Sequence, residues 1–122
     1  MEDLDKEYLS YFNSIKDSLP KNVVQLSEIS MHDVNVESIE TPSKETFIMN
    51  LDCEGGFNDF SKIKLTFTGV KEISMPENIE EGFWLYDEIY LTNSGFELHV
   101  LFDIPFTEFK IEAENILIEA IE

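Results

Sequence analysis

Apolar and polar side chains alternate along several segments of this chain, and this alternation constrains the fold most. In residues 46–53 every second position holds an apolar residue, namely Phe47, Met49, Leu51 and Cys53. Residues 62–67 repeat the pattern, and residues 108–122 show it with a change of phase at Asn115. A two-residue period places alternate side chains on opposite faces of a strand. These segments are therefore predicted to be strands with one buried face, the last segment forming one or two strands.

Residues 84–103, WLYDEIYLTNSGFELHVLFD, predict a β-hairpin. Two alternating segments flank a turn at residues 93–96, where Gly95 is predicted to supply a positive φ. A register with Thr92 opposite Glu97 sorts aliphatic side chains to one face and aromatic and acidic ones to the other. The predicted pairs are Leu91–Leu98, Ile89–Val100 and Asp87–Phe102 on the aliphatic face, and Tyr90–His99, Glu88–Leu101 and Tyr86–Asp103 on the polar face.

An amphipathic helix is predicted near the N-terminus. Its apolar stripe recurs at steps of three and four residues, through Leu4, Tyr8, Phe12, Ile15 and Leu19. Pro20 ends this helix, and residues 21–29 fit either a short helical turn or the entry to a strand. The predicted fold is α+β: residues 1–122 form a single domain, with an N-terminal helix packed on a mostly antiparallel, curled sheet of about six strands.

The charge of the chain is strongly negative. The 26 acids face eight lysines and no arginine, for a formal net charge of -18. Residues 72–122 hold half of the acids but only one lysine, Lys110. Such a field repels nucleic acid and anionic lipid, and it attracts basic surfaces. The lack of arginine also disfavours a phosphate-binding site. A role in solubility alone is the competing interpretation.

Residues suited to catalysis or metal binding are few. His32 and His99 are the only histidines, Cys53 is the only cysteine, and no nucleophile elbow, P-loop or dinucleotide-binding turn occurs. The acidic residues 52–59 do not follow the spacing of a calcium-binding loop. Cys53 continues an apolar alternation, so it is predicted to be a small buried side chain. We therefore expect no enzymatic activity, no cofactor and no metal site.

A cytoplasmic location is expected. The N-terminal residues MEDLDKEYLS are acidic and lack the apolar core of a secretory signal. Uncharged apolar runs extend over only a few residues, so no membrane association is expected. The single cysteine has no partner for an internal disulfide, as is usual for proteins of a reducing compartment.

The polar face of the predicted hairpin is the candidate binding surface. Acids interleaved with tyrosine and tryptophan suit the capture of a protein rich in lysine and arginine, because the aromatic rings supply contact area and the acids steer association. The competing interpretation is that the aromatic residues cap the core. The predicted partner-binding residues are Glu80, Glu81, Trp84, Tyr86, Glu88, Tyr90, Glu97, His99 and Asp103.

The phrases WLYDEIYL, FELHVLFD and FKIEAENILIE, within residues 84–119, resemble the C-terminal part of small acidic uncharacterised bacterial proteins. In that class such chains are often immunity proteins, so the resemblance implies a bacterial, non-enzymatic protein. The leading hypothesis is an acidic, non-enzymatic protein that docks on a basic protein partner, and its most concrete form is an immunity protein neutralising a nuclease-like toxin. The alternatives are a structural or regulatory domain that is acidic only for solubility, and a small ligand-binding half-barrel using His99 and Tyr90.

Overall fold

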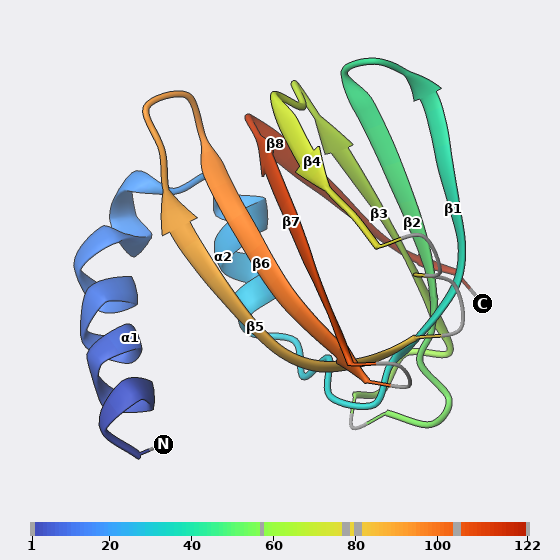
Figure 1. Ribbon diagram of the computed structural model, residues 1–122, viewed down its shortest axis with the longest axis horizontal. Coiled ribbons are helices and arrows are strands. Elements are labelled where there is room, and N and C mark those ends of the chain that lie inside the picture. The colour runs from blue at the N-terminus through green and yellow to red at the C-terminus, as the bar shows by residue number, and fades with distance from the viewer. Residues whose placement is uncertain (1, 57, 77–78, 80–81, 104–105, 122) are drawn as a thin grey trace.

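A computed structural model describes the backbone of residues 2–56, 58–76, 79, 82–103 and 106–121 (Figure 1). The chain forms two α-helices, a single 3-10 turn and eight strands in these ranges. The helical elements are α1 (Glu2–Ile15), η1 (Lys16–Ser18) and α2 (Lys21–Ser27). The strands are β1 (Asn35–Ser43), β2 (Thr46–Asp52), β3 (Lys62–Thr68), β4 (Glu72–Ser74), β5 (Phe83–Leu91), β6 (Phe96–Asp103), β7 (Thr107–Ala113) and β8 (Asn115–Ile121).

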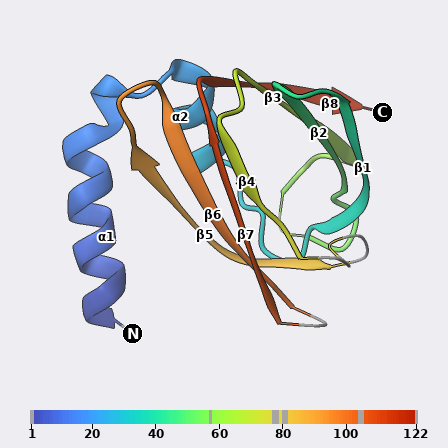
Figure 2. The ribbon, with the colours of Figure 1, turned by 45° about the horizontal axis from the view of Figure 1, so that its top comes forward.

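The strands form one antiparallel sheet in the order β4-β7-β6-β5-β1-β2-β3-β8. The sheet is strongly curled but not closed, and α1 lies outside it beside β5 (Figures 1 and 2). The predicted α+β class with an antiparallel sheet is confirmed. The predicted number of about six strands is too low, because residues 72–74 form a separate strand, β4, and the C-terminal segment, predicted as one or two strands, divides into β7 and β8.

Pro20 separates the two helices. α1 ends at Ile15 and η1 at Ser18, close to the predicted end at Leu19. The φ of Pro20 is -55°, and its carbonyl accepts the N–H groups of Val23 and Val24, so it begins α2. The two alternatives left open for residues 21–29 are thereby decided in favour of a helix. The helices formed by the described residues lack the length and apolar character needed to cross a membrane.

The interior of the curled sheet is filled by the alternating apolar side chains. The predicted inward side chains of β2 and β3 are all buried. Phenylalanines from opposite walls meet there: the ring centroids of Phe47 and Phe109 are 5.7 Å apart, and those of Phe67 and Phe96 are 6.3 Å apart. The core therefore depends on the curl, which brings β2 and β3 over β6 and β7.

A shared corner joins the two ends of the sheet. Only one residue, Glu114, separates β7 from β8, yet β7 pairs with β4 and β6 while β8 pairs with β3. The N–H of Glu114 donates to the carbonyl of Thr68 at 3.0 Å. Next to it, Gly69 has a φ of 62°, which a glycine adopts without strain. Gly69 and the change of phase predicted at Asn115 therefore belong to one corner.

The predicted hairpin of residues 84–103 exists, but its register is wrong by two residues. Leu91 lies opposite Phe96 and Ile89 opposite Leu98. Because the error is even, it does not exchange the two faces, so Leu98 still points inward. The turn comprises residues 92–95, one residue earlier than predicted, and the N–H of Thr92 donates to the carbonyl of Gly95.

The predicted reason for Gly95 is also wrong. Among the described glycines, positive φ occurs at Gly69 and not at Gly95. A Cβ added at Gly95 would instead lie 2.2 Å from the carbonyl oxygen of Ala113. Gly95 is required because the tip of this hairpin contacts the backbone of the corner between β7 and β8.

Replacement of Gly95 tests this close approach. Gly95→Ala is expected to lower the free energy of unfolding by about 2 kcal/mol or more, since the new methyl group meets a backbone atom that cannot move alone. Gly55→Ala is the control, because its Cβ would have no neighbour closer than 3.8 Å. Urea unfolding measures both variants, and equal stability of the two would contradict the assignment.

Candidate functional site

A β-bulge at the start of β5 reverses the orientation of Trp84. Trp84 lies opposite Phe102, but Tyr86 lies opposite Leu101, so Leu85 is an extra residue on β5. The bulge turns Trp84 to the inner face, where it is 1% exposed and packs edge-on against Phe102. The prediction that Trp84 binds a partner is therefore wrong, because it assumed uninterrupted alternation. Its side chain belongs to the core.

Asp87 shares the inner side of β5 with Trp84. The indole N–H of Trp84 donates to the Asp87 carboxylate at 2.7 Å. Burial raises the pKa of Asp87 above its ordinary value, the Trp84 hydrogen bond opposes this in part, and the nearby Glu88 adds to the increase. Asp87 lies opposite Val100, not opposite Phe102 as predicted.

The outward side chains of β5 and β6 form a connected polar cluster. Both tyrosine hydroxyls donate to Glu88, Tyr86 at 2.8 Å and Tyr90 at 2.5 Å. The hydrogen bond to Glu88 is the main reason that the pKa of Tyr90 rises to about 12. The ring centroids of Tyr90 and His99 are 4.9 Å apart in an edge-on arrangement, and His99 hydrogen-bonds Glu97. The structure thus brings together five of the predicted binding residues.

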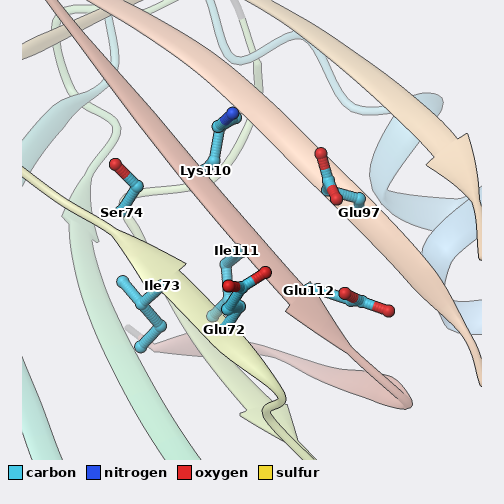
Figure 3. Close-up of a pocket in the computed structure, with 7 residues that line it drawn as sticks. All are labelled: Glu72, Ile73, Ser74, Glu97, Lys110, Ile111 and Glu112. Carbon is cyan, nitrogen blue, oxygen red and sulfur yellow. The ribbon is translucent and has the colours of Figure 1, made fainter.

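Three glutamates extend this cluster across the sheet. Glu72 of β4 lies opposite Glu112 of β7, and Glu112 lies opposite Glu97 of β6 (Figure 3). Tyr90 of β5 is opposite Glu97 and completes the line. We call Glu72, Glu112 and Glu97 the acidic row. It lines a shallow hollow of about 190 Å³ together with Ile73, Ser74, Lys110 and Ile111.

Sequence reasoning missed Glu72 and Glu112. Their outward direction could have been read from the alternation around Ile73 and Ile111, but the pairing of β4 with β7 is not visible in the sequence. The remaining predicted residues lie elsewhere: Asp103 is exposed at the end of β6, opposite Phe83. Glu80 and Glu81 lie outside the described residues.

The outer face of β4, β7, β6 and β5 is unlike the outer face of the other four strands. We call the first surface the acidic face, comprising the acidic row, Glu88 and Glu108 with Lys110 and His99. On the second surface, Lys62 pairs with Glu37 at 3.1 Å, and Lys64 lies opposite Glu119. Positive and negative groups are therefore mixed there, whereas the acidic face carries a clear excess of carboxylates.

The single cysteine lies in the core. Cys53 is 1% exposed, and burial raises the pKa of its thiol, which is the environment of an inert core cysteine. Its predicted burial is confirmed. Within the part of the chain that the structure describes, no group of three His, Cys, Asp or Glu side chains is placed to hold a metal ion.

The comparisons with known proteins give a family. Residues 1–113 match the model of DUF4085, described as a protein of unknown function. The chain belongs to the DUF4085 family. No curated protein matches it. A crystal structure of an uncharacterised protein from Neisseria gonorrhoeae is similar at 18% identity and a TM-score of 0.48, covering 74% of this chain and 93% of that chain.

The buried carboxyl group gives this DUF4085 chain a testable dependence of stability on pH. Folding raises the pKa of Asp87 from its ordinary value of 3.8, so the folded state binds the proton more tightly than the unfolded state. The stability of the wild type should therefore fall as pH rises through this value toward the folded pKa. Asp87→Asn is expected to remove that loss, making the variant more stable than the wild type at neutral pH.

Urea unfolding of the wild type and Asp87→Asn between about pH 3 and about pH 7 measures this effect. Asp59→Asn, in an exposed turn, controls for the removal of one carboxylate. A constant difference in unfolding free energy between Asp87→Asn and the wild type at every pH would show that the Asp87 carboxyl group does not titrate as described.

Proposed function

We propose that this protein is a non-enzymatic binding protein whose acidic face docks on a basic protein partner. The observation that carries the proposal is the acidic row, in which Glu72, Glu112 and Glu97 occupy directly opposite positions on three neighbouring strands. Like charges at opposite positions destabilise a sheet. A cationic partner surface would relieve that repulsion on binding and would be drawn to it by long-range attraction.

Solubility alone does not require the carboxylates to be gathered on one face. A net charge of -18 would keep the chain soluble wherever the carboxylates were placed. The second outer face intersperses lysines and acids, as Lys62 with Glu37 illustrates, and avoids repulsion. The gathering of glutamates on the acidic face supports a partner more than it supports solubility.

The most concrete form of the proposal is an immunity protein that covers a nuclease-like toxin. A nuclease binds phosphates through basic residues, and the spaced carboxylates of the acidic row could occupy the same positions. Inhibition would then be steric and electrostatic and would need no catalytic residue. The half-barrel alternative has less support, because the Tyr90 and His99 rings contact each other on the outer face and do not line the interior.

Two matched triple variants test the proposal. Glu72→Gln/Glu97→Gln/Glu112→Gln neutralises the acidic row, and Glu28→Gln/Glu54→Gln/Glu119→Gln removes the same charge from exposed positions elsewhere. Each is used to capture proteins from the native host, and the association rate of the purified partner is then measured. The acidic-row variant should associate roughly tenfold more slowly than the control variant.

Salt dependence and inhibition complete this test. The association rate of the wild type should fall steeply between about 50 mM and about 500 mM salt, because ions screen exposed charges. For the immunity version, the captured partner should have nuclease activity that the wild type inhibits. Equal rates for the two triple variants, or indifference to salt, would count against docking through the acidic face.

Neutralisation of the acidic row should also stabilise the free protein. Removing the repulsion of two opposed pairs is expected to raise the free energy of unfolding by about 0.5–1 kcal/mol, whereas the control variant should change it less. Urea unfolding at low salt measures both. A destabilised acidic-row variant would mean that these glutamates contribute to the fold, which contradicts their assignment as a binding surface.

A further inference from the structure

One edge of β5 lacks a partner strand over most of its length. β1 meets β5 at Asn35 and Phe83, and no further strand pairing extends along β5 on that side within the described residues. Edge strands present unpaired N–H and C=O groups that can bind another strand. Residues 87–91 of β5 therefore form an edge without a partner strand, which we call the free edge, and Figures 1 and 2 show α1 lying alongside it.

Side chains satisfy the backbone groups of this free edge. The N–H of Ile89 donates to the Tyr8 hydroxyl at 2.6 Å, and that hydroxyl donates back to the Ile89 carbonyl at 3.4 Å. The N–H of Leu91 donates to the Tyr11 hydroxyl at 3.1 Å. Tyr8 thus offers one acceptor and one donor to a single residue, as a paired strand would. The two tyrosine hydroxyls therefore supply hydrogen bonds that a neighbouring strand would otherwise make.

α1 covers the edge through one face, on which Tyr8 and Tyr11 contact the ring of Tyr90 and Phe12 packs against the core. Away from that face, Leu9 is 56% exposed. The edge adjoins the acidic face, so a cationic partner matches its surroundings in charge.

A basic extended segment would be a better match. Along the free edge, the outward side chains of β5 are Glu88 and Tyr90, and the inward side chains include Ile89. A strand added there would place alternate residues beside Glu88 and Tyr90, where lysine or arginine is favoured. The intervening residues would face inward, where an apolar side chain such as valine is favoured.

We propose that the free edge of β5 receives an extended segment of the basic partner, with cationic and apolar residues alternating, which adds to the sheet as a strand in place of α1. This inference rests on the proposed function and specifies how the partner is bound. The main-chain hydrogen bonds of the added strand replace those of Tyr8 and Tyr11, and its cationic side chains lie next to Glu88. α1 acts as a cover that protects the edge until the partner arrives.

Two synthetic peptides provide the test. One alternates lysine and valine over about eight residues, and the other has the same composition with the lysines in one block. Binding is measured by fluorescence anisotropy on the full chain. The alternating peptide should bind roughly tenfold more tightly, because only that peptide presents its charges on one side of a strand. Equal affinity for the two peptides, or binding of neither, overturns the proposal.

Release of the cover gives a second measurement. Tyr8→Phe/Tyr11→Phe removes both hydroxyls and should tighten binding of the alternating peptide roughly fivefold or more, because the competing helix is held less firmly. Leu9→Ala, on the exposed side of α1, is the matched control. Unchanged affinity in the double variant, with its fold confirmed by circular dichroism, overturns the proposal.

The amide signals of the wild type keep the proposal testable if the double variant does not fold. On addition of the alternating peptide, the amides of Ile89 and Leu91 should shift in nuclear magnetic resonance spectra, and the signals of α1 should move toward those of a free helix or coil. Shifts confined to the acidic row, with α1 unchanged, would reject strand addition but keep docking on the acidic face. The two triple glutamine variants test the acidic face separately, so failure of one proposal is distinguishable from failure of the other.

Discussion

The packing of phenylalanine rings across the interior of the curled sheet is the interaction on which the rest of the structure depends. Phe47 meets Phe109, and Phe67 meets Phe96, although each pair joins strands from opposite walls. These contacts require the sheet to curl, and the corner at Gly69 lets the chain turn where the two walls meet. Because the inner face excludes solvent, the alternation of side chains along a strand directs the outward side chains to solvent.

The acidic face is a consequence of this arrangement. Curling exposes one continuous outer surface over β4, β7, β6 and β5, and the outward positions of these strands are rich in glutamate. The repulsion within the acidic row costs stability in the free protein. In the same half of the sheet, one edge of β5 lacks a partner strand over most of its length, and Tyr8 and Tyr11 of α1 bind its backbone there. A surface and an edge that suit a basic strand therefore lie side by side.

Local patterns predicted the elements well and their exact pairing less well. The alternation of β2, β3, β6 and β7 follows from solvent exclusion on one face, and it was confirmed for the described residues of these strands. Trp84 was assigned to the wrong face because its backbone bonds Asp33 and Val34, which are remote in sequence, where the bulge forms. Gly95 was recognised as necessary, but the atom that requires it belongs to Ala113 on another strand.

For the regularly alternating strands β2, β3, β6 and β7, the sequence by itself determined which side chains face the core and which face water, since this needs only the period of a strand and the hydrophobic effect. It also determined the charge of the chain and its concentration after residue 72. The tertiary structure alone decided that Glu72, Glu97 and Glu112 are neighbours, because strand order depends on how distant segments share one core. For the same reason, only the folded chain shows that α1 covers the free edge of β5.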